Sequence, residues 1–257
     1  MRQVLSEQEK FETAAAWLKN SHRAVALTGA GISTPSGIPD FRSQNQGLWN
    51  RFDPIEVASI RTFHQNPRRF FDWFIPLLQQ SMNAQPNSAH LGLAKLEQVG
   101  ILKTIITQNI DGLHHRAGSK KILEVHGSVR QMTCTHCHRT VDNEKNLEHL
   151  LNGHIPHCSE CNGILKPDVI LFGEPLPAET WENAMTFSQT CDVMLVIGSS
   201  LEVMPVAGLP LDALDNHAKI ILINRTPTYL DNQADFIFRE DLAIVVPKIV
   251  EITRAYS

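Results

Sequence analysis

The 257-residue sequence lacks an uninterrupted apolar run that could cross a membrane, since none reaches the ~18 residues that a spanning helix needs. Its N-terminus turns charged within a few residues and lacks the apolar centre of a signal peptide, so we expect a cytoplasmic protein. It also lacks an excess of basic residues, because the formal net charge is −4. That balance excludes nucleic-acid binding carried by bulk positive charge, and we expect no membrane partner and no direct nucleic-acid partner.

Cysteine is scarce, and the five cysteines present cannot form a complete set of internal disulfides because their number is odd. Four of them form two C-x-x-C pairs, Cys134/Cys137 and Cys158/Cys161, separated by twenty residues. In a chain without an export signal this spacing favours a metal site over disulfides. Four thiolates can enclose one zinc ion and leave no open position for water, which predicts a structural site. Nearby histidines are alternative ligands: His136, His138, His154 and His157.

Repeats and low-complexity segments are also missing, and short apolar runs separated by helix-like stretches dominate the chain. These runs, apolar on both faces, are typical of buried parallel strands; they cover residues 24–28, 101–107, 193–197 and 219–223. Helices are predicted at the N-terminus, where Ser6 and Glu9 have capping-box spacing, and over residues 87–99 and 242–255. The pattern predicts an α/β fold, a Rossmann-like parallel sheet with helices on both faces.

Two stretches interrupt the strand–helix alternation. Residues 36–86 carry scattered proline, aromatic and arginine residues, and residues 130–165 carry the paired cysteines. We therefore predict a Rossmann-like domain made of residues 1–35, 87–127 and 166–257. A smaller domain, residues 36–86 and 128–165, would combine a helical insertion with a zinc-ribbon module.

A glycine-rich turn, Gly29-Ala30-Gly31, directly follows the first predicted strand. Such a turn lets backbone N–H groups approach a phosphate. The dinucleotide fingerprint G-x-G-x-x-G is nevertheless incomplete, because Thr34 stands at the third glycine position. About twenty residues further on stands Arg51 rather than an acid, although Asp53 is close. From the turn alone, a tight strand–helix connection without a ligand remains an open alternative.

The longer string from Gly29 to Arg42, GAGISTPSGIPDFR, resembles the sirtuins, the NAD-dependent protein deacylases, of bacterial type. The resemblance extends over nearly the whole chain. Its further motifs follow in the family's order: Gln108-Asn109-Ile110-Asp111, His126-Gly127, the four cysteines, Phe172-Gly173-Glu174, Gly198-Ser199-Ser200-Leu201 and Ile223-Asn224.

The resemblance implies that the Rossmann-like domain binds NAD. Arg42 would pair with the pyrophosphate and Phe41 would shield a reactive sugar cation from water. The residues near Asp241 depart from the family pattern, so the adenine contact at Leu242 is carried over with the weakest support. The implied cofactor-binding residues are Gly29, Ala30, Gly31, Ser33, Asp40, Phe41, Arg42, Gln108, Asn109, Ile110, Asp111, Gly198, Ser199, Ser200, Asn224 and Leu242.

The resemblance also implies catalytic and substrate-binding residues. His126 would be the general base, for which an ordinary pKa of ~6.5 is suited. Asn109 and Asp111 would hold the nicotinamide ribose and carboxamide, with Asn109 counted among the catalytic residues, although a plain turn after a strand is the structural alternative. Two edges would bind an acyl-lysine peptide as an added strand: residues 169–174, with Val169, Phe172, Gly173 and Glu174, and residues 201–206, with Val203.

The implied reaction is deacylation of protein lysine with consumption of NAD, producing nicotinamide and O-acyl-ADP-ribose; one structural zinc ion would take no part in the chemistry. An ADP-ribosyltransferase or NAD glycohydrolase is the alternative that uses the same pocket. A nicotinamide-dependent dehydrogenase and a non-enzymatic zinc-ribbon binding module are further alternatives. The incomplete glycine fingerprint and the four-cysteine module argue against the dehydrogenase.

Acyl selectivity can also be read from the resemblance. Sirtuins that prefer succinyl- or malonyl-lysine carry a Tyr-x-x-Arg pair that binds the distal carboxylate, and often Thr where Asp40 stands here. In this chain Phe74 and Leu77 occupy the aligned positions of that pair. We therefore predict deacetylation, tolerance of longer apolar acyl groups and poor desuccinylation, with a plain core role for Phe74 and Leu77 as the alternative.

Overall fold

A computed structural model of the protein describes residues 5–42 and 47–255. The expectation for the first four residues lies outside the described residues, as do residues 43–46 of the predicted insertion 36–86. Within these residues, no helix combines the length and apolarity that crossing a membrane demands. The α-helices are α1 (Glu7–Asn20), α2 (Pro54–Ala58), α3 (Ile60–Gln65), α4 (Pro67–Asn83), α5 (Ser88–Gln98), α6 (Leu113–Arg116), α7 (Glu144–Leu151), α8 (Ala178–Thr190), α9 (Leu209–Asp215) and α10 (Leu242–Ala255).

The larger part of the molecule is built on a parallel sheet with the strand order β3-β2-β1-β7-β8-β9. The four predicted strands are confirmed as the centre of this sheet. Of the two three-residue strands at its edges, β9 was missed, whereas β3 ends just before His126, where we expect a strand to end. Its strands are β1 (Ala24–Thr28), β2 (Leu102–Thr107), β3 (Ile122–Glu124), β7 (Val193–Ile197), β8 (Lys219–Ile223) and β9 (Phe236–Phe238).

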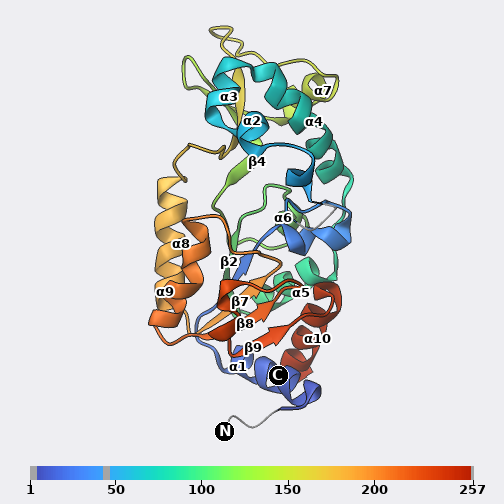
Figure 1. The fold of residues 1–257 in the computed structure, drawn as a ribbon, viewed down its shortest axis with the longest axis vertical. Helices are drawn as coiled ribbons and strands as arrows, with labels where there is room; N and C mark the ends of the chain where they lie inside the picture. The colour runs from blue at the N-terminus through green and yellow to red at the C-terminus, as the bar shows by residue number, and fades with distance from the viewer. Residues whose placement is uncertain (1–4, 43–46, 256–257) are drawn as a thin grey trace.

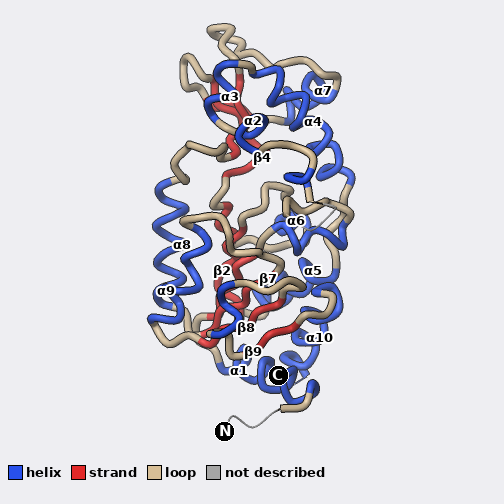
Figure 2. Tube along the Cα trace, in the orientation of Figure 1, coloured by secondary structure: helices blue, strands red, loops and turns tan. Residues whose placement is uncertain are grey.

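Helices cover both faces of this sheet, as Figures 1 and 2 show, with α1, α5 and α10 on one face and α8 and α9 on the other. Successive residues of β1 alternate between the two cores: Ala24 and Ala26 pack in the first, and Val25 and Leu27 in the second. Both sides of the strand are therefore buried, which explains its continuous apolar run. The capping box of α1 is confirmed by reciprocal hydrogen bonds between Ser6 and Glu9.

The smaller part lies at one end of the long axis of the molecule (Figure 1) and contains α2, α3, α4, α7 and an antiparallel sheet. The order in this sheet is β5-β4-β6, formed by β4 (Gly127–Cys134), β5 (Thr140–Asp142) and β6 (Leu165–Val169). A cluster of phenylalanines from α3 and α4 packs against residues of β4 and β6 such as Met132 and Leu165. The helical insertion and the cysteine-bearing segment thus share one core.

Two local differences separate the structure from the sequence pattern. Residues 166–169, expected within the Rossmann-like segment, belong to β6 and pair with β4 in the small sheet. Their apolar residues alternate along the strand, so only one face needs a core, and the small domain supplies it. Residues Ala30–Ser36 after the glycine turn form a 3₁₀-helix rather than an α-helix.

Candidate active site

The carboxyl ends of the central strands open into a cavity of about 990 Å³ between the two parts of the molecule. The sheet order reverses between β2 and β7, on either side of β1, and ligands of open α/β sheets bind at such a switch point. All predicted site residues of the cofactor, catalytic and substrate sets line this cavity, with the single exception of Leu242. The Leu242 side chain is buried in the core at the start of α10, and the adenine contact there stays a prediction.

The glycines after β1 are required by close backbone packing. A Cβ atom on Gly31 would lie 2.8 Å from the Cα of Gly198, and one on Gly29 would lie 2.8 Å from the Gly198 carbonyl oxygen. Gly198 itself has a φ of 61°, and it has no side chain that would keep the backbones of Gly29 and Gly31 at a distance. The backbone N–H of Gly31 donates to that same carbonyl at 2.8 Å. The two glycine turns therefore pack directly against each other.

A hydrogen-bonded group of three polar side chains lies beside these turns. The Ser33 hydroxyl donates to the Asp111 carboxylate at 2.6 Å, and the Asn109 amide donates to Ser33 Oγ and to the Gly29 carbonyl, both at 3.1 Å. Burial raises the pKa of the Asp111 carboxyl, although the hydrogen bonds from Ser33 and the Leu113 backbone oppose this. The structure thus brings Asn109, Asp111 and Ser33 together from two segments nearly eighty residues apart in sequence.

His126 stands where the chain leaves the large sheet after β3 and enters the small sheet with β4. Its Nδ1 lies 3.1 Å from the carbonyl oxygen of Gln108. A carbonyl can only accept, so Nδ1 carries the proton and Nε2 keeps its lone pair. Burial lowers the pKa of His126, and the nearby Arg42 lowers it further against the opposing effect of the Gln108 carbonyl. The ring is therefore neutral at neutral pH, as a base must be.

Gly127 explains why a glycine follows this histidine. Its φ is 77°, and a Cβ atom there would lie 2.0 Å from the carbonyl oxygen of Asp168 in β6. Beside this close approach of the two strands, the His126 carbonyl accepts a hydrogen bond from the Ile170 backbone N–H at 2.8 Å. His126 is thereby anchored to the segment predicted to bind substrate.

The two predicted peptide edges lie on the same cavity. In the first edge, the backbone of Phe172 donates to the Ala58 carbonyl at 2.9 Å and accepts from the Ile60 N–H at 3.0 Å. Just before the second edge in sequence, Ser199 Oγ accepts a hydrogen bond from the Gln108 side-chain amide at 2.9 Å.

Trp49 and Trp73 were not predicted from the sequence, and they join the predicted Phe41 and Phe172 in an aromatic wall of the cavity. Phe41 and Trp49 have ring centroids 5.0 Å apart, and Trp49 also meets Trp73 at 5.9 Å and Phe172 at 6.2 Å. Four separate segments contribute these rings, and no spacing in the sequence links them. Phe74 and Leu77 of α4 also line the cavity.

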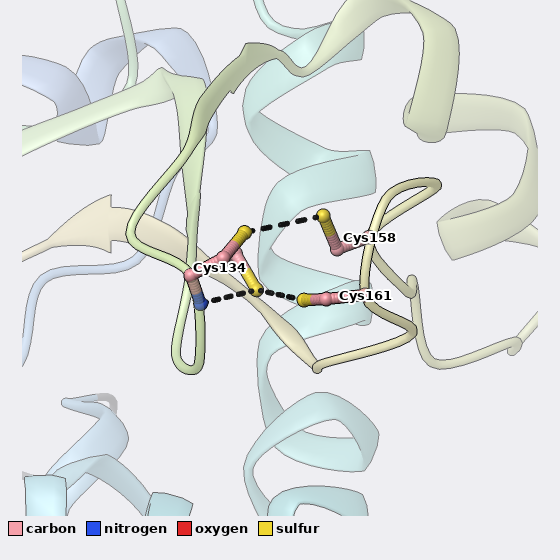
Figure 3. A group of neighbouring side chains, drawn as sticks. Cys134, Cys158 and Cys161 are labelled. Atoms are coloured by element: carbon pink, nitrogen blue, oxygen red, sulfur yellow. Dashed lines mark hydrogen bonds between the residues drawn. The ribbon is translucent and has the colours of Figure 1, made fainter.

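The four paired cysteines form one cluster away from the cavity, and none of them lines it. Their sulfur atoms all lie within 4.8 Å of one another; Cys134 Sγ is 3.4 Å from Cys161 Sγ, and Cys137 Sγ is 3.7 Å from Cys158 Sγ. Figure 3 shows the sulfur atoms converging from two loops.

The backbone around the cysteine cluster fits a zinc ion. Hydrogen bonds from backbone N–H groups, that of Cys137 foremost, lower the pKa of the Cys134 thiol to about 6 and favour its thiolate, whereas burial and the neighbouring cysteines raise the pKa of Cys161. A Cβ atom on Gly163 would lie 2.8 Å from Cys134 Sγ, so only glycine leaves this space open. The donor set is that of a closed, structural zinc site.

Comparison with known proteins agrees with this geometry. Residues 29–205 match the model of the Sir2 family. The chain is 45% identical over 245 residues to the NAD-dependent protein deacylase 2 of Archaeoglobus fulgidus, covering 95% of this chain and 96% of the relative. It is 44% identical to the NAD-dependent protein deacetylase of Saccharolobus solfataricus over 95% of this chain and 97% of the relative.

Solved structures give the same result. A structure described in a study of the mechanism and regulation of Sir2 enzymes superposes with a TM-score of 0.90 at 44% identity, covering 97% of this chain and 100% of that one. A Sir2 protein bound to a myristoylated histone peptide has a TM-score of 0.83 at 39% identity, covering 97% and 98%. A Sir2 homologue in complex with NAD has a TM-score of 0.87 at 37% identity, covering 100% and 97%. The chain belongs to the Sir2 family of NAD-dependent protein deacetylases and deacylases.

Proposed function

We propose that this protein removes acyl groups from lysine side chains of proteins or peptides, with NAD as co-substrate, and that its catalytic centre is the cavity around His126. The observation that carries the proposal is the position of this histidine. Its Nδ1 is held by the Gln108 carbonyl, and the same cavity is lined by the Ser33–Asn109–Asp111 group on one side and by the peptide edges on the other. One base thus borders both the predicted cofactor site and the predicted substrate site.

NAD supplies a ribose C1′ carbon from which nicotinamide can leave, so that the acyl oxygen can bond to it. His126 Nε2 then accepts a proton from a ribose hydroxyl, which makes that oxygen able to attack the acyl carbon. The Gln108 carbonyl supports this step twice: it fixes the tautomer, and it stabilises the imidazolium that forms.

The remaining cavity residues orient and shield the reaction. Asn109 and Asp111 orient the nicotinamide ribose and carboxamide, and Ser33 holds the Asp111 carboxylate in place. Arg42 pairs with the pyrophosphate through its guanidinium. The aromatic wall beginning at Phe41 excludes water, which would otherwise consume NAD without deacylation.

The two predicted domains have separate tasks in this proposal. The Rossmann-like domain binds NAD, and the smaller domain closes the cavity on the acyl side. The zinc ion, held by Cys134, Cys137, Cys158 and Cys161, stabilises the smaller domain. The acyl-lysine peptide adds as a strand between residues 169–174 and 201–206, where backbone hydrogen bonds bind it without regard to most side chains.

Acyl selectivity follows from the side chains at the end of the cavity. From α4 the lining residues are Trp73, Phe74, Leu77, Leu78 and Ser81. Among the described lining residues, Arg42 is the one lysine or arginine, and it is assigned to the pyrophosphate. A succinyl carboxylate buried there would lose its hydration without gaining a cationic partner, at a cost of roughly several kcal/mol. An acetyl or longer apolar group gains from burial at about 25 cal/mol per Å².

Product analysis tests both parts of the proposal. Matched acetyl-, myristoyl- and succinyl-lysine peptides are incubated with NAD, and the products are identified by mass spectrometry. We expect O-acyl-ADP-ribose and the deacylated peptide as products. The kcat/KM for the succinyl peptide should be at least tenfold below that for the acetyl peptide. ADP-ribosylated protein, or free ADP-ribose alone, would instead indicate an ADP-ribosyltransferase or an NAD glycohydrolase. A succinyl value equal to the acetyl value would refute the assigned selectivity.

A further inference from the structure

Each of the two peptide edges carries one carboxylate, and the two carboxylates are held very differently. Glu174 belongs to the first edge and Glu202 to the second, and both line the cavity. The side chain of Glu174 is 18% exposed, whereas that of Glu202 is 60% exposed.

The Glu174 carboxylate is held by an ion pair and a hydrogen bond within the protein. Its carboxylate accepts from Lys166 Nζ at 3.1 Å and from the Leu171 backbone N–H at 2.9 Å. Lys166 also donates to the carbonyls of Pro167 and Val169. Removing Glu174 from this arrangement would leave a half-buried ammonium without its counter-ion, so this carboxylate stays where it is.

Glu202 has a single partner within the described chain, Arg42, whose Nε lies 2.8 Å from its carboxylate. Exposed ion pairs of this kind contribute only about 0–1 kcal/mol, so the pair separates easily. Arg42 is also the residue assigned to the pyrophosphate, a doubly charged group that binds guanidinium more strongly than one exposed carboxylate does. When Arg42 turns to the pyrophosphate, Glu202 loses the one partner that it has among residues 5–42 and 47–255.

We propose that Glu202 is a specificity-determining residue: with NAD bound, it selects substrates that carry a lysine or arginine next to the acyl-lysine. The proposal rests on the proposed function, because it takes the 201–206 segment as a peptide edge. Val203, the next residue, belongs to that edge, so a carboxylate at position 202 lies within reach of side chains that flank the acyl-lysine. Because NAD draws Arg42 away from Glu202, the preference for a basic residue in the peptide becomes stronger when the cofactor is bound. Cofactor binding and peptide binding are therefore coupled.

The test uses acetyl-lysine peptides with arginine, alanine or glutamate placed in turn at each neighbouring position. For the unmodified protein we expect kcat/KM to favour the best-placed arginine over glutamate by roughly fivefold. Glu202→Gln should abolish this ratio and Glu202→Lys should invert it. Glu251→Gln, which makes the same charge change on the exposed face of α10, is the matched control and should keep the ratio.

Peptide binding measured by calorimetry gives a readout that needs no turnover. The arginine preference should be stronger with ADP-ribose than without it, and it should fade as ionic strength rises from about 0.05 to 0.5 M. The same ratio in Glu202→Gln as in the unmodified protein, or no difference with ADP-ribose, would refute the role of Glu202. Failure of every peptide to be deacylated would instead count against the proposed function, and the binding measurement would still decide the role of Glu202.

Discussion

The two parts of the molecule reach stability by different routes. In the large sheet, β1 and β7 are buried along their whole length and are covered by helices on both faces. In the small sheet, β5 is largely exposed and β4 is only partly buried. The large part can therefore rely on apolar burial, whereas the small part depends on its cysteine cluster as well as on the phenylalanines of α3 and α4. Apolar burial distributes the stability of the large part over many residues. In the small part, a metal site makes much of the stability depend on four cysteines.

The largest expected effect comes from removing one zinc ligand. Cys134→Ser should release the metal and unfold the small sheet, because structural zinc contributes on the order of 10 kcal/mol to the folding of small modules. Zinc content by elemental analysis and hydrogen exchange along β4 and β6 measure this, and deacylation should be lost as well. Cys191→Ser, the same change at the buried cysteine outside the cluster, should keep one zinc ion per chain. A Cys134→Ser protein with a protected small sheet would contradict the difference between the two parts.

The next effect concerns the junction between the two sheets. His126→Ala should lower kcat/KM by about 10²–10⁴-fold while ADP-ribose affinity changes little, because a general base is lost but the cofactor site is not. Since burial lowers the pKa of His126, the neutral base should persist below the ordinary histidine range, and activity should stay level as pH falls through 6.5. His64→Ala, an exposed histidine on α3, is the control. Near-normal turnover by His126→Ala would remove it from the mechanism.

The large part contains a buried histidine, His90, that should make its stability depend on pH in the acid range. His90 is fully buried in α5, its Nδ1 lies 3.4 Å from the Asn87 N–H, and burial together with Arg116 lowers its pKa to about 4. The folded protein therefore excludes a proton that the unfolded chain binds below its ordinary pKa of about 6.5. The contribution of His90 to stability should be complete above that pH and decline between pH 6.5 and 4, by at most about 3 kcal/mol.

His90→Gln should make this decline shallower, as measured by urea unfolding at a series of pH values, and the buried His114, whose pKa burial also lowers, should account for part of what remains. Both proteins carry the same cysteine cluster, so any acid effect on zinc cancels in the difference between them. An unchanged decline would show that acid acts on the protein elsewhere.

The smallest effect separates cofactor use from peptide binding at the switch point. Asn109→Ala and Asp111→Ala should each reduce nicotinamide exchange by about 10- to 100-fold, because each removes hydrogen bonds of a buried polar group. Acyl-peptide affinity should fall much less, since neither residue belongs to a peptide edge. Equal loss of both would mean that the substitutions disturb the fold rather than the cofactor site.

Local sequence patterns were sufficient for elements whose cause is local. The apolar run of β1 predicts a strand because both of its faces are buried, and the spacing of Ser6 and Glu9 predicts a helix start because the capping bonds span three residues. Two C-x-x-C pairs predict a metal site because each pair is one compact turn. The three-residue strand β9 was missed, since it exists only as an addition to the neighbouring strand β8.

The sequence by itself determined the α/β class, the four metal ligands and, through the family resemblance, most of the polar residues that line the cavity. Only the tertiary structure decided that β6 pairs with β4, that His126 keeps its Nε2 lone pair because the Gln108 carbonyl binds Nδ1, and that Glu202 has Arg42 as its partner. Each of these depends on a contact between segments far apart in the chain. Such contacts are selected by the packing of the whole molecule, so no local spacing records them.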